Sequence, residues 1–505
     1  MMAGAVPAGT AGAAGIPTAI TIATASPPPT LDPYFTTTEA SLEISIEVFN
    51  TLAAYNSSFQ LEPQLATSWS SSHNYTDWTL NLAHGIKFQN GQTMTSADVV
   101  ASLERFQKVG ALNEFMSNIT AITAKGPYTV DITLKQPDAV LINQLANPLT
   151  LIAIMPAKYA RIDKPLPWNE LIGTGPYMYA SVKPGVSVTL KRFDGYTPAS
   201  HAPASGLAGD QVAHIQQLTF QYVPSSATRL AGLESGTFQY AESVPYAAYT
   251  SILHNPAVKP AINKYFFDIL FQVNEKTPPL NNRYMREGID RVLNESAIMQ
   301  VVTNGVKAFY HLNPSIIYPQ EKLWWSAAGS SGYDHPNVKA AKALFKKAGY
   351  HGQPIVILSN TTYGWMYKTT IVVERELKQA GVNVKLDVSD WPAEVARAHS
   401  GSSQGWNLMI TGWSPYTDPA DYSAGLSTGG ALDFGFSSKK MDALLAAGVS
   451  TSNTAARVKI YREVQKLFYR DLPEIPIGNL YGLDAYASSL KGFYPWYLPR
   501  FWNVS

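Results

Sequence analysis

The regular alternation of helical and strand-like stretches between residues 335 and 412 most strongly limits what this chain can fold into. Each helical stretch carries apolar residues on one face, and the first ends at Gly349. Helices are predicted at 338–348, 366–380 and 392–399, and strands at 354–358, 382–388 and 406–411. Strands that alternate with helices pair as a parallel sheet with crossover helices. The sequence therefore predicts an α/β fold in this part of the chain.

Outside this region the clearest elements are two strands and one helix. Residues 19–24 and 186–190 alternate between apolar and polar side chains, as half-buried strands do. Thr95 and Asp98 have the spacing of a helix capping box, and Val99, Leu103 and Phe106 follow on one face. A helix is therefore expected after Thr95.

The length and charge of the chain limit its class of function. A chain of 505 residues exceeds the size at which one hydrophobic core stops growing, so more than one domain is expected. Lys and Arg number 38 against 37 Asp and Glu, which gives no reason to expect nucleic acid as a partner. The chain has no cysteine, which excludes thiol nucleophiles, disulfides and cysteine-based zinc sites.

The first residues, 1–16, are small and apolar and lack the basic region of a signal peptide. We interpret them as a disordered remnant left after a signal peptide was removed, which points to the periplasm of a Gram-negative type of cell. A cytosolic protein with an unstructured N-terminus remains an alternative at this stage. No apolar run reaches the roughly 18 residues that cross a bilayer.

The segment Gly412–Tyr422, GWSPYTDPADY, directly follows the last predicted strand of the alternating region. In parallel sheets ligands bind beyond the carboxyl ends of the strands, so this segment is a candidate binding loop. Asp421 is expected to cap a following turn, whereas Asp418, held extended before Pro419, is expected to point into a cleft. Trp391 and Trp413 also follow strand ends and could form two walls of a pocket, because aromatic side chains often line ligand sites.

Catalytic and metal motifs are weak in this sequence. Residues 401–405 match G-x-S-x-G, but a helix precedes them, a strand follows, and the last histidine is His399. The nine histidines show no pair at metal-ligand spacing, so no metal or cofactor is expected. One enzymatic alternative stays open, a secreted carbohydrate hydrolase that uses Asp418 and Asp421 as its carboxylate pair.

Ten motifs in order resemble the bacterial solute-binding proteins of family 5, which serve ABC importers of peptides, nickel and opines. They are TLDP, LEPQLATSW, GIKFQNGQTMTSADVVASLERF, IGTGPYMY, RFDGY, LAGLESGTFQYAESVP, PPLNNRYMREGIDRVLN, VKAAKALFKKAG, FGFSSKKMDALLAAG and DLPEIPIGN. The resemblance covers about residue 18 to the C-terminus.

This resemblance implies an α/β, two-lobed periplasmic binding protein (Venus-flytrap) fold with an extra inserted N-terminal subdomain. The predicted domains are lobe I at 17–46, 174–266 and 475–505, the inserted subdomain at 47–173, and lobe II at 267–474. Hinge closure of the two lobes on a solute would follow.

The implied function is that of an extracytoplasmic substrate-binding protein, not an enzyme. It would capture a short peptide, peptide-like compound, opine, sugar or metal chelate and deliver it to the membrane subunits of an ABC permease. We expect a monomer that binds no nucleic acid and needs no cofactor. A family member repurposed for signalling is a further alternative.

The resemblance also implies where the solute binds. Peptide-binding members usually carry an Asp three residues after the tryptophan of the 412–422 loop, where this chain has Tyr416. A buried charge without a partner is costly, so a neutral or weakly charged solute is expected. The predicted ligand-contacting residues are Trp413, Ser414, Tyr416, Thr417, Asp418, Trp391, Tyr240, Thr37, Phe271 and Asn274.

Overall fold

One long mixed sheet runs through most of the molecule. The computed structural model describes residues 17–399, 405–430, 432 and 434–505. The predicted N-terminal remnant and most of the G-x-S-x-G motif lie outside these residues. The sheet order is β15 (Val384–Ser389), β14 (Ile355–Asn360), β16 (Leu408–Trp413), β12 (Val258–Val273), β17 (Glu474–Ala487), β11 (Tyr240–Ala241), β1 (Ala19–Thr24), β10 (Gln217–Tyr222), β9 (Ser187–Arg192) and β8 (Tyr177–Lys183), with β13 (Tyr310–His311) paired to β17.

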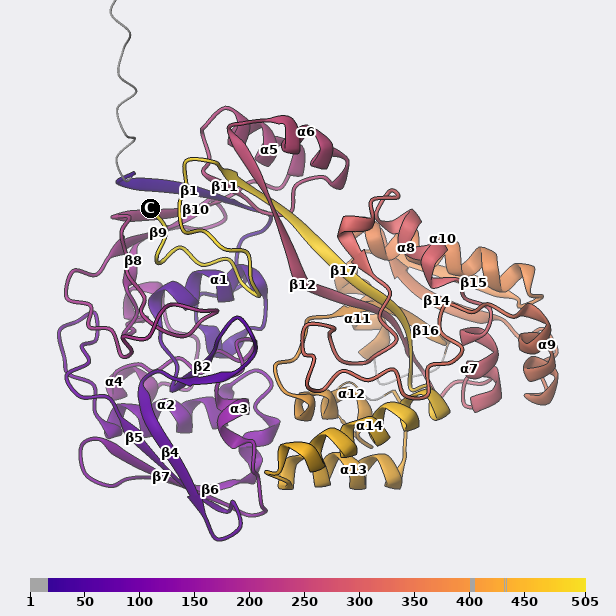
Figure 1. The fold of residues 1–505 in the computed structure, drawn as a ribbon, viewed down its shortest axis with the longest axis horizontal. Helices are drawn as coiled ribbons and strands as arrows, with labels where there is room; N and C mark the ends of the chain where they lie inside the picture. The colour runs from indigo at the N-terminus through magenta and orange to yellow at the C-terminus, as the bar shows by residue number, and fades with distance from the viewer. Residues whose placement is uncertain (1–16, 400–404, 431, 433) are drawn as a thin grey trace, which may run out of the picture.

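The strands β12 and β17 join the two halves of this sheet. They are 16 and 14 residues long and pair antiparallel over most of their length. Figure 1 shows them crossing the middle of the molecule, with β14, β15 and β16 at one end and β1, β8, β9 and β10 at the other. The pairing shifts register between Asn263 and Phe267 and again between Ile269 and Leu270. Such irregularities bend a strand pair locally, so this is where the two ends can change their relative orientation.

The half with β14, β15 and β16 confirms the predicted α/β alternation. β14 pairs parallel with both β15 and β16, as crossover helices require. The helices are α9 (Val338–Lys347), α10 (Gly364–Gln379) and α11 (Trp391–His399), each within about two residues of its predicted bounds. Buried Val373 and Leu377 of α10 pack into the core between helices and sheet, together with Phe271 of β12. This half is called lobe II.

The other half, called lobe I, contains both strands predicted near the N-terminus and at 186–190. β1 lies between β10 and β11 and runs parallel to both. The helix α1 (Glu39–Val48) packs beside this part of the sheet and is buried along most of its length. The predicted lobe boundary at 266/267 falls inside β12, and the one at 474/475 falls at the start of β17. The exact domain boundaries therefore stay predictions.

A separate sheet of four strands forms the inserted subdomain. Its order is β4 (Ala66–Ser72), β5 (Asp77–Leu82), β7 (Thr129–Leu134) and β6 (Ile119–Ala124), and a two-stranded ribbon joins β2 (Ala53–Tyr55) to β3 (Leu61–Pro63). The helix α2 (Ser96–Val109) begins with the predicted capping box, in which Asp98 Oδ2 accepts a hydrogen bond from Thr95 N at 2.9 Å. The capped helix packs against β6 and β7 of this sheet.

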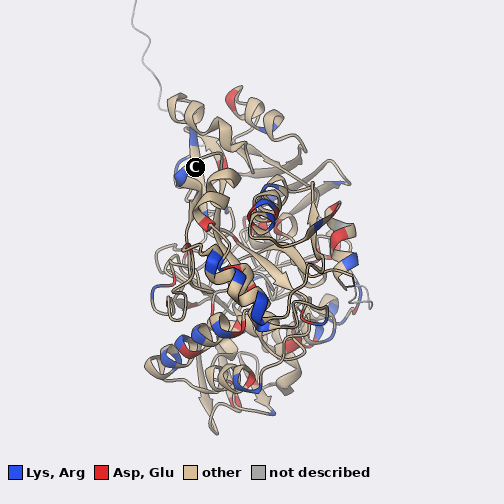
Figure 2. Ribbon diagram, turned by 90° about the vertical axis from the view of Figure 1, so that its right-hand side faces the viewer, with Lys and Arg blue, Asp and Glu red and all other residues tan. Residues whose placement is uncertain are grey.

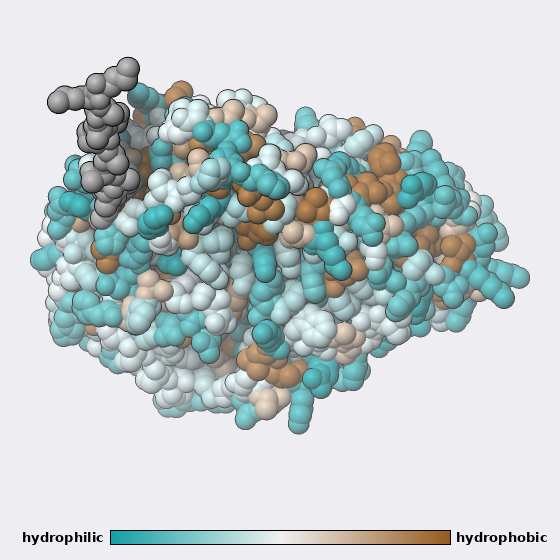
Figure 3. All heavy atoms as spheres, turned by 45° about the horizontal axis from the view of Figure 1, so that its top comes forward, coloured by the Kyte–Doolittle hydropathy of each residue, from teal (hydrophilic) through white to brown (hydrophobic). Residues whose placement is uncertain are grey.

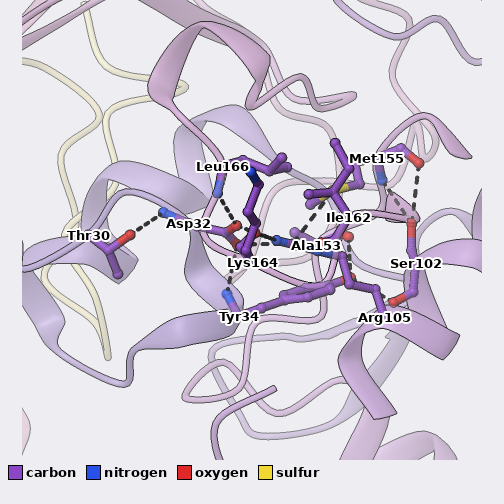
Figure 4. A network of polar contacts seen from close by, with 10 residues as sticks. All are labelled: Thr30, Asp32, Tyr34, Ser102, Arg105, Ala153, Met155, Ile162, Lys164 and Leu166. Atoms are coloured by element: carbon purple, nitrogen blue, oxygen red, sulfur yellow. Dashed lines mark hydrogen bonds and ion pairs between the residues drawn. The ribbon is translucent and has the colours of Figure 1, made fainter. Parts of the chain in front are cut away.

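A buried ion pair fastens the inserted subdomain to the N-terminal segment. Arg105 of α2 binds the carboxylate of Asp32, and both side chains are completely buried (Figure 4). Asp32 also accepts a hydrogen bond from Leu166 N at 3.0 Å, and Arg105 donates to the carbonyl oxygens of Ile162 and Lys164. Every polar atom of the pair is satisfied, which compensates the cost of removing both charges from water.

The remaining helices surround these sheets. They are α3 (Leu141–Leu145), α4 (Ala157–Ala160), α5 (Ser226–Glu234), α6 (Tyr249–His254), α7 (Arg283–Asp290), α8 (Glu295–Val302), α12 (Ser423–Leu426), α13 (Lys439–Ser450) and α14 (Thr454–Asp471). α13 and α14 pack together over their own hydrophobic cluster, which contains Leu445, Tyr461 and Phe468.

The outer surface offers no dominant charge or apolar face in the views shown. Lys and Arg occur in short groups with Asp and Glu among them, and most of the ribbon in Figure 2 is uncharged. On the face in Figure 3 hydrophobic residues form small patches separated by hydrophilic ones. Within the described part of the chain, no helix has both the length and the apolar character needed to span a membrane.

Candidate functional site

The loop predicted to bind ligand extends from lobe II to lobe I. Trp413 ends β16, and its indole Nε1 donates a hydrogen bond to Glu474 Oε1 at 3.2 Å. Two residues later the carbonyl oxygen of Pro415 accepts a hydrogen bond from the hydroxyl of Tyr497, from lobe I, at 3.0 Å. Tyr416 then packs against the core shared by lobe I and the inserted subdomain and meets Tyr422 edge to face at 4.8 Å. The structure is therefore a closed arrangement of the two lobes at this loop.

The roles predicted for the two aspartates of the loop are exchanged in the structure. Asp418, expected to point into a cleft, caps the 3₁₀ turn Pro419–Tyr422 by accepting from Ala420 N at 2.9 Å. Its carboxylate is 1% exposed and paired with Arg457 of α14. Asp421, expected to be structural, lines a cavity instead. The correction follows from Arg457, because the cation that neutralises Asp418 comes from a helix distant in sequence.

This cavity, called the loop cavity, lies between the inserted subdomain and the segment 416–430 and has a volume of about 260 Å³. Its lining residues are Leu112, Glu114, Phe115, Gln144, Asn147, Thr150, Tyr416, Ala420, Asp421, Ser423, Ala424, Ser427, Gly429 and Gly430. Asn147 Nδ2 donates to Asp421 Oδ2 at 3.3 Å across the junction. The two sides of the cavity thus come from different parts of the fold.

The loop cavity contains a polar atom that the protein does not satisfy. Gln144 is 8% exposed, and its Oε1 has no hydrogen-bond partner within the described residues. Leaving a buried acceptor unpaired costs about 1–3 kcal/mol, so a site with this feature gains when a solute supplies a donor. Burial, and secondly the nearby Asp418, raise the pKa of Asp421 well above its ordinary value. The cavity therefore offers an unpaired acceptor beside a carboxyl group whose burial favours the neutral form.

The other predicted residues of lobe II lie around this cavity or away from it. Ser414 is half-buried and Thr417 is buried at 3% exposure, both within the loop. Trp391 opens α11 and packs against Tyr363 with ring centroids 5.9 Å apart. Neither Trp391 nor Trp413 is among the described residues that line the loop cavity. The structure therefore does not bring the two tryptophans together as its walls.

Two predicted contacts near the hinge are corrected by the structure. Phe271 is fully buried in the lobe II core, between Ile410 of β16 and Ile475 of β17. Asn274 is also fully buried and donates to the carbonyl oxygen of Trp406 at 3.0 Å, which fixes the turn after β12. Both side chains are used in packing the fold, Phe271 on the strand that joins the lobes and Asn274 in the turn directly after it.

Of the predicted contacts in lobe I, one is exposed and one lies at a second cavity. Thr37 is exposed at the surface. Tyr240 of β11 is 1% exposed, and its hydroxyl donates to Asp484 Oδ2 at 2.7 Å. The second cavity, called the acidic pocket, has a volume of about 20 Å³ and is lined by Glu39, Glu43, Tyr240, Glu242, Ser243, Asn263, Phe266, Asp484, Tyr497 and Pro499.

Sequence reasoning missed the acidic pocket, although one signal was present. Glu39, Glu43 and Glu47 repeat at intervals of four residues, which places like charges on one face of a helix. Like charges at this spacing destabilise a helix, so such a face needs another reason to exist. Within the described residues, no group of His, Asp and Glu is arranged to hold a metal ion.

A two-lobed α/β fold, with lobes joined by shared strands and a cavity at their junction, defines the class of bilobal solute-binding proteins. Residues 60–432 match the bacterial extracellular solute-binding proteins, family 5 (middle region). The chain therefore belongs to this family, which consists of binding proteins of ABC importers and not of enzymes.

Individual relatives match along nearly the whole chain. A probable peptide ABC transporter periplasmic-binding protein of Sinorhizobium fredii is 28% identical over 493 residues, covering 94% of this chain and 91% of the relative. The glutathione-binding protein GsiB of Escherichia coli K12 is 28% identical over 485 residues, covering 93% and 90%. The periplasmic binding protein AgaA of A. tumefaciens R10, solved with agropinic acid, superposes with a TM-score of 0.80 at 25% identity over 96% of this chain and 98% of that one. The predicted family and fold are confirmed.

Proposed function

We propose that this protein captures a peptide-like solute of about di- or tripeptide size in the loop cavity and delivers it to the membrane subunits of an ABC importer. The observation that carries the proposal is a cavity formed by both sides of the closed molecule, with Gln144, whose buried Oε1 is unpaired among the described residues, in its wall. An amide N–H of a peptide is the donor that this atom lacks. The relatives named for peptide, glutathione and agropinic acid support a solute that carries amide or amine groups.

The size and lining of the loop cavity support a small solute. About 260 Å³ lies just below the roughly 300–1,000 Å³ of typical ligand sites. Tyr416 and Phe115 offer apolar area, while Asn147, Thr150 and Ser423 offer hydroxyl and amide groups. Such a lining favours a neutral backbone over a strongly anionic group.

Closure supplies the signal for transport. The loop 412–422 touches lobe I through Pro415, and Ala139 N of the inserted subdomain donates to Val449 O at 2.9 Å. A solute that contacts both sides binds the closed state in preference to the open one and so increases its population. We propose that the permease recognises this closed form, that the protein acts as a monomer, and that it works outside the cytoplasm, in the periplasm.

Thermal unfolding in the presence of candidate solutes tests the proposal. The panel contains dipeptides, tripeptides, glutathione, an opine, a nickel–histidine chelate and an oligosaccharide. A solute present at 100 times its Kd adds about 2.7 kcal/mol to the stability of the folded protein. We expect peptides or glutathione to raise the melting temperature. Stabilisation by the oligosaccharide or the nickel chelate alone would overturn the peptide-like assignment.

A further inference from the structure

The acidic pocket lies where the two long strands leave lobe I. α1 contributes Glu39 and Glu43, the segment after β11 contributes Glu242, and β17 contributes Asp484. Asn263 and Phe266 of β12 close the pocket beside the register shift, and Tyr497 closes it from the C-terminal segment. Tyr497 is also the residue that binds Pro415 of the 412–422 loop. The pocket is thus lined by lobe I, beside the two strands that lead into lobe II.

The acidic groups of this pocket outnumber the cations near them among the described residues. Within the described residues, none of its four carboxylates takes part in an ion pair. Arg229 is nearby, but its guanidinium donates to the backbone carbonyl oxygens of Glu242 at 2.6 Å and of Ser243 at 2.8 Å. The remaining guanidinium contacts go to the carbonyl oxygens of Val223 and Pro224. The pocket therefore keeps an excess of acidic groups.

Two of the four acids accept hydrogen bonds from the protein, and a third has an oxygen without a partner in the part of the chain that the structure describes. Glu242 Oε2 accepts from Ala25 N at 2.6 Å, and Asp484 accepts from Ser243 N and from the Tyr240 hydroxyl, both at 2.7 Å. Glu43 is 2% exposed, and its Oε1 has no partner among the described residues. A buried carboxylate oxygen that faces a cavity without a donor is an incomplete site.

The dimensions of the pocket limit the group that it can hold. A cavity of about 20 Å³ is close to the roughly 10–15 Å³ that a single water molecule needs. A primary ammonium is about as large as a water molecule and carries three donors, whereas a planar guanidinium is much larger. Glu39 is half-buried, and Tyr363 of lobe II, beside Glu39 and Glu242, is 42% exposed. The pocket is therefore reachable from solvent at Glu39.

We propose that the acidic pocket binds a primary ammonium group of the transported solute, through Glu43 and Glu39 with Glu242 and Asp484 behind them. This inference rests on the proposed function and adds to it the charge of the solute. It also revises the expectation of a neutral solute drawn from Tyr416, because the compensating carboxylates lie on lobe I and not on the loop.

Proton binding makes the site dependent on pH. Burial, and next the neighbouring Glu242 and Asp484, raise the pKa of Glu39 to about 8, and burial raises the pKa of Glu242 to about 7. Without a solute the pocket therefore holds protons in place of a cation. The titratable and charged groups that face it are Glu39, Glu43, Tyr222, Arg229, Tyr240, Glu242, Tyr246, Tyr363, Asp484 and Tyr497. An ammonium group must displace these protons, so its advantage increases from pH 5.5 to pH 7, below the range near pH 8 in which a peptide α-ammonium loses its own proton.

Four tripeptides separate the sources of an ammonium group in a calorimetric binding test. Ala-Lys-Ala carries both the α- and the ε-ammonium group, and Ala-norleucine-Ala carries the α-ammonium alone. N-acetylation removes the α-ammonium, so acetyl-Ala-Lys-Ala keeps only the ε-ammonium and acetyl-Ala-norleucine-Ala carries neither. We expect acetyl-Ala-norleucine-Ala to bind at least 100-fold more weakly than the best of the others. If acetylation lowers the affinity, the α-ammonium group enters the pocket. If replacement of lysine by norleucine lowers the affinity, the ε-ammonium group enters it.

Two variants and one control connect this preference with the pocket. Glu43→Gln is expected to reduce the ammonium preference at least tenfold, because an amide cannot ionise to pair with the cation. It should leave the melting temperature of the solute-free protein nearly unchanged, because the protonated carboxyl group and the amide are both neutral and of similar size. Glu39→Gln, at a half-buried position, gives a second measurement if the first variant folds poorly. Glu234→Gln, at an exposed position of α5, should change neither quantity.

The outcomes separate this inference from the proposed function. Equal binding of acetyl-Ala-norleucine-Ala, or an unchanged preference in both pocket variants, overturns the acidic pocket as an ammonium site while peptide capture stands. Binding only of solutes that lack an ammonium group has the same meaning. If neither the tripeptides nor any solute of the thermal panel binds, both proposals fail.

Discussion

The guanidinium of Arg457 donates to both carboxylate oxygens of Asp418, at 2.6 Å from Nη2 to Oδ1 and 3.2 Å from Nη1 to Oδ2. Asp418 lies in the loop that follows β16, whereas Arg457 lies on α14 and also contacts the ring of Trp324 at 4.8 Å. The pair therefore holds the binding loop against the helical layer behind it. This fixes the position of Asp421, three residues further on, at the loop cavity.

Removal of Arg457 should destabilise the protein strongly. The variant Arg457→Met leaves the buried carboxylate of Asp418 without its partner, which costs about 3–5 kcal/mol. Adding Asp418→Asn to the same chain should recover part of this loss, because no uncompensated charge remains. Urea unfolding measures both, with Glu463→Gln at an exposed ion pair as the control that should not change. An Arg457→Met protein as stable as the parent would contradict the assignment.

Replacement of Gln144 should separate binding from stability. The variant Gln144→Leu removes an acceptor that is unpaired without solute, so we expect stability to stay the same or rise slightly. Peptide affinity should fall about tenfold, or about 1.4 kcal/mol, because the solute loses its acceptor. Calorimetry with the peptide found in the thermal panel gives the affinity, and Gln136→Leu at an exposed position serves as control. Unchanged affinity would place the solute elsewhere.

Loss of the Tyr497 hydroxyl should favour an open form. Tyr497→Phe removes the hydrogen bond to Pro415 O, worth about 0.5–1.5 kcal/mol, and this bond exists only when the lobes meet. Small-angle X-ray scattering without solute should give a larger radius of gyration, and solute affinity should fall about fivefold. Tyr494→Phe, at a side chain that is 54% exposed, is the matched control. If the two variants scatter alike, this hydrogen bond does not govern closure.

Stability should fall as the pH rises through the neutral range. Glu47 of α1 is fully buried, and burial raises its pKa to about 8 although Phe501 N and Arg500 oppose the shift. A raised pKa means that the folded state favours the protonated group. Its stabilising contribution is complete below the unfolded pKa of about 4.5 and is lost as the pH rises through 8.

The variant Glu47→Gln measures this contribution. Gln keeps an acceptor for Phe501 N, which binds Glu47 Oε1 at 2.6 Å, but it cannot ionise. In the parent protein the free energy of unfolding should decrease between pH 5 and pH 8. In the variant it should decrease less steeply, by up to about 1.4 kcal/mol per pH unit. Urea unfolding at several pH values gives the slope, and the exposed Glu104→Gln is the control. A parent protein that gains stability over this range would contradict the raised pKa.

The elements of lobe II were predictable because their signals are local. The periodic apolar residues of 338–348 and the β-type run at 354–358 show their structure within a few residues of sequence. The capping box at Thr95 and Asp98 is equally local, and the structure confirms it. The family resemblance gave the order of the lobes, since ten motifs occur in sequence.

The chemistry of the site was less predictable because its partners are far apart in the chain. The position of Asp418 depends on Arg457, and the acidic pocket joins Glu43 with Glu242 and Asp484, which only the folded sheet brings together. Phe271 was misassigned for a related reason. Its place on β12 was correctly near the lobe junction, but the side of the strand on which it lies was not visible without the neighbouring strands.

The two shared strands also restrict what a membrane partner can detect. β12 and β17 are neighbours in one sheet, so bending them changes mainly a single angle between the lobes. If closure follows this one angle, solutes with different side chains would bring the protein to a similar outer shape. A permease that docks on that shape responds to the angle and leaves chemical discrimination to the interior. Selectivity for new solutes can then evolve inside the cavities without a change in the docking surface.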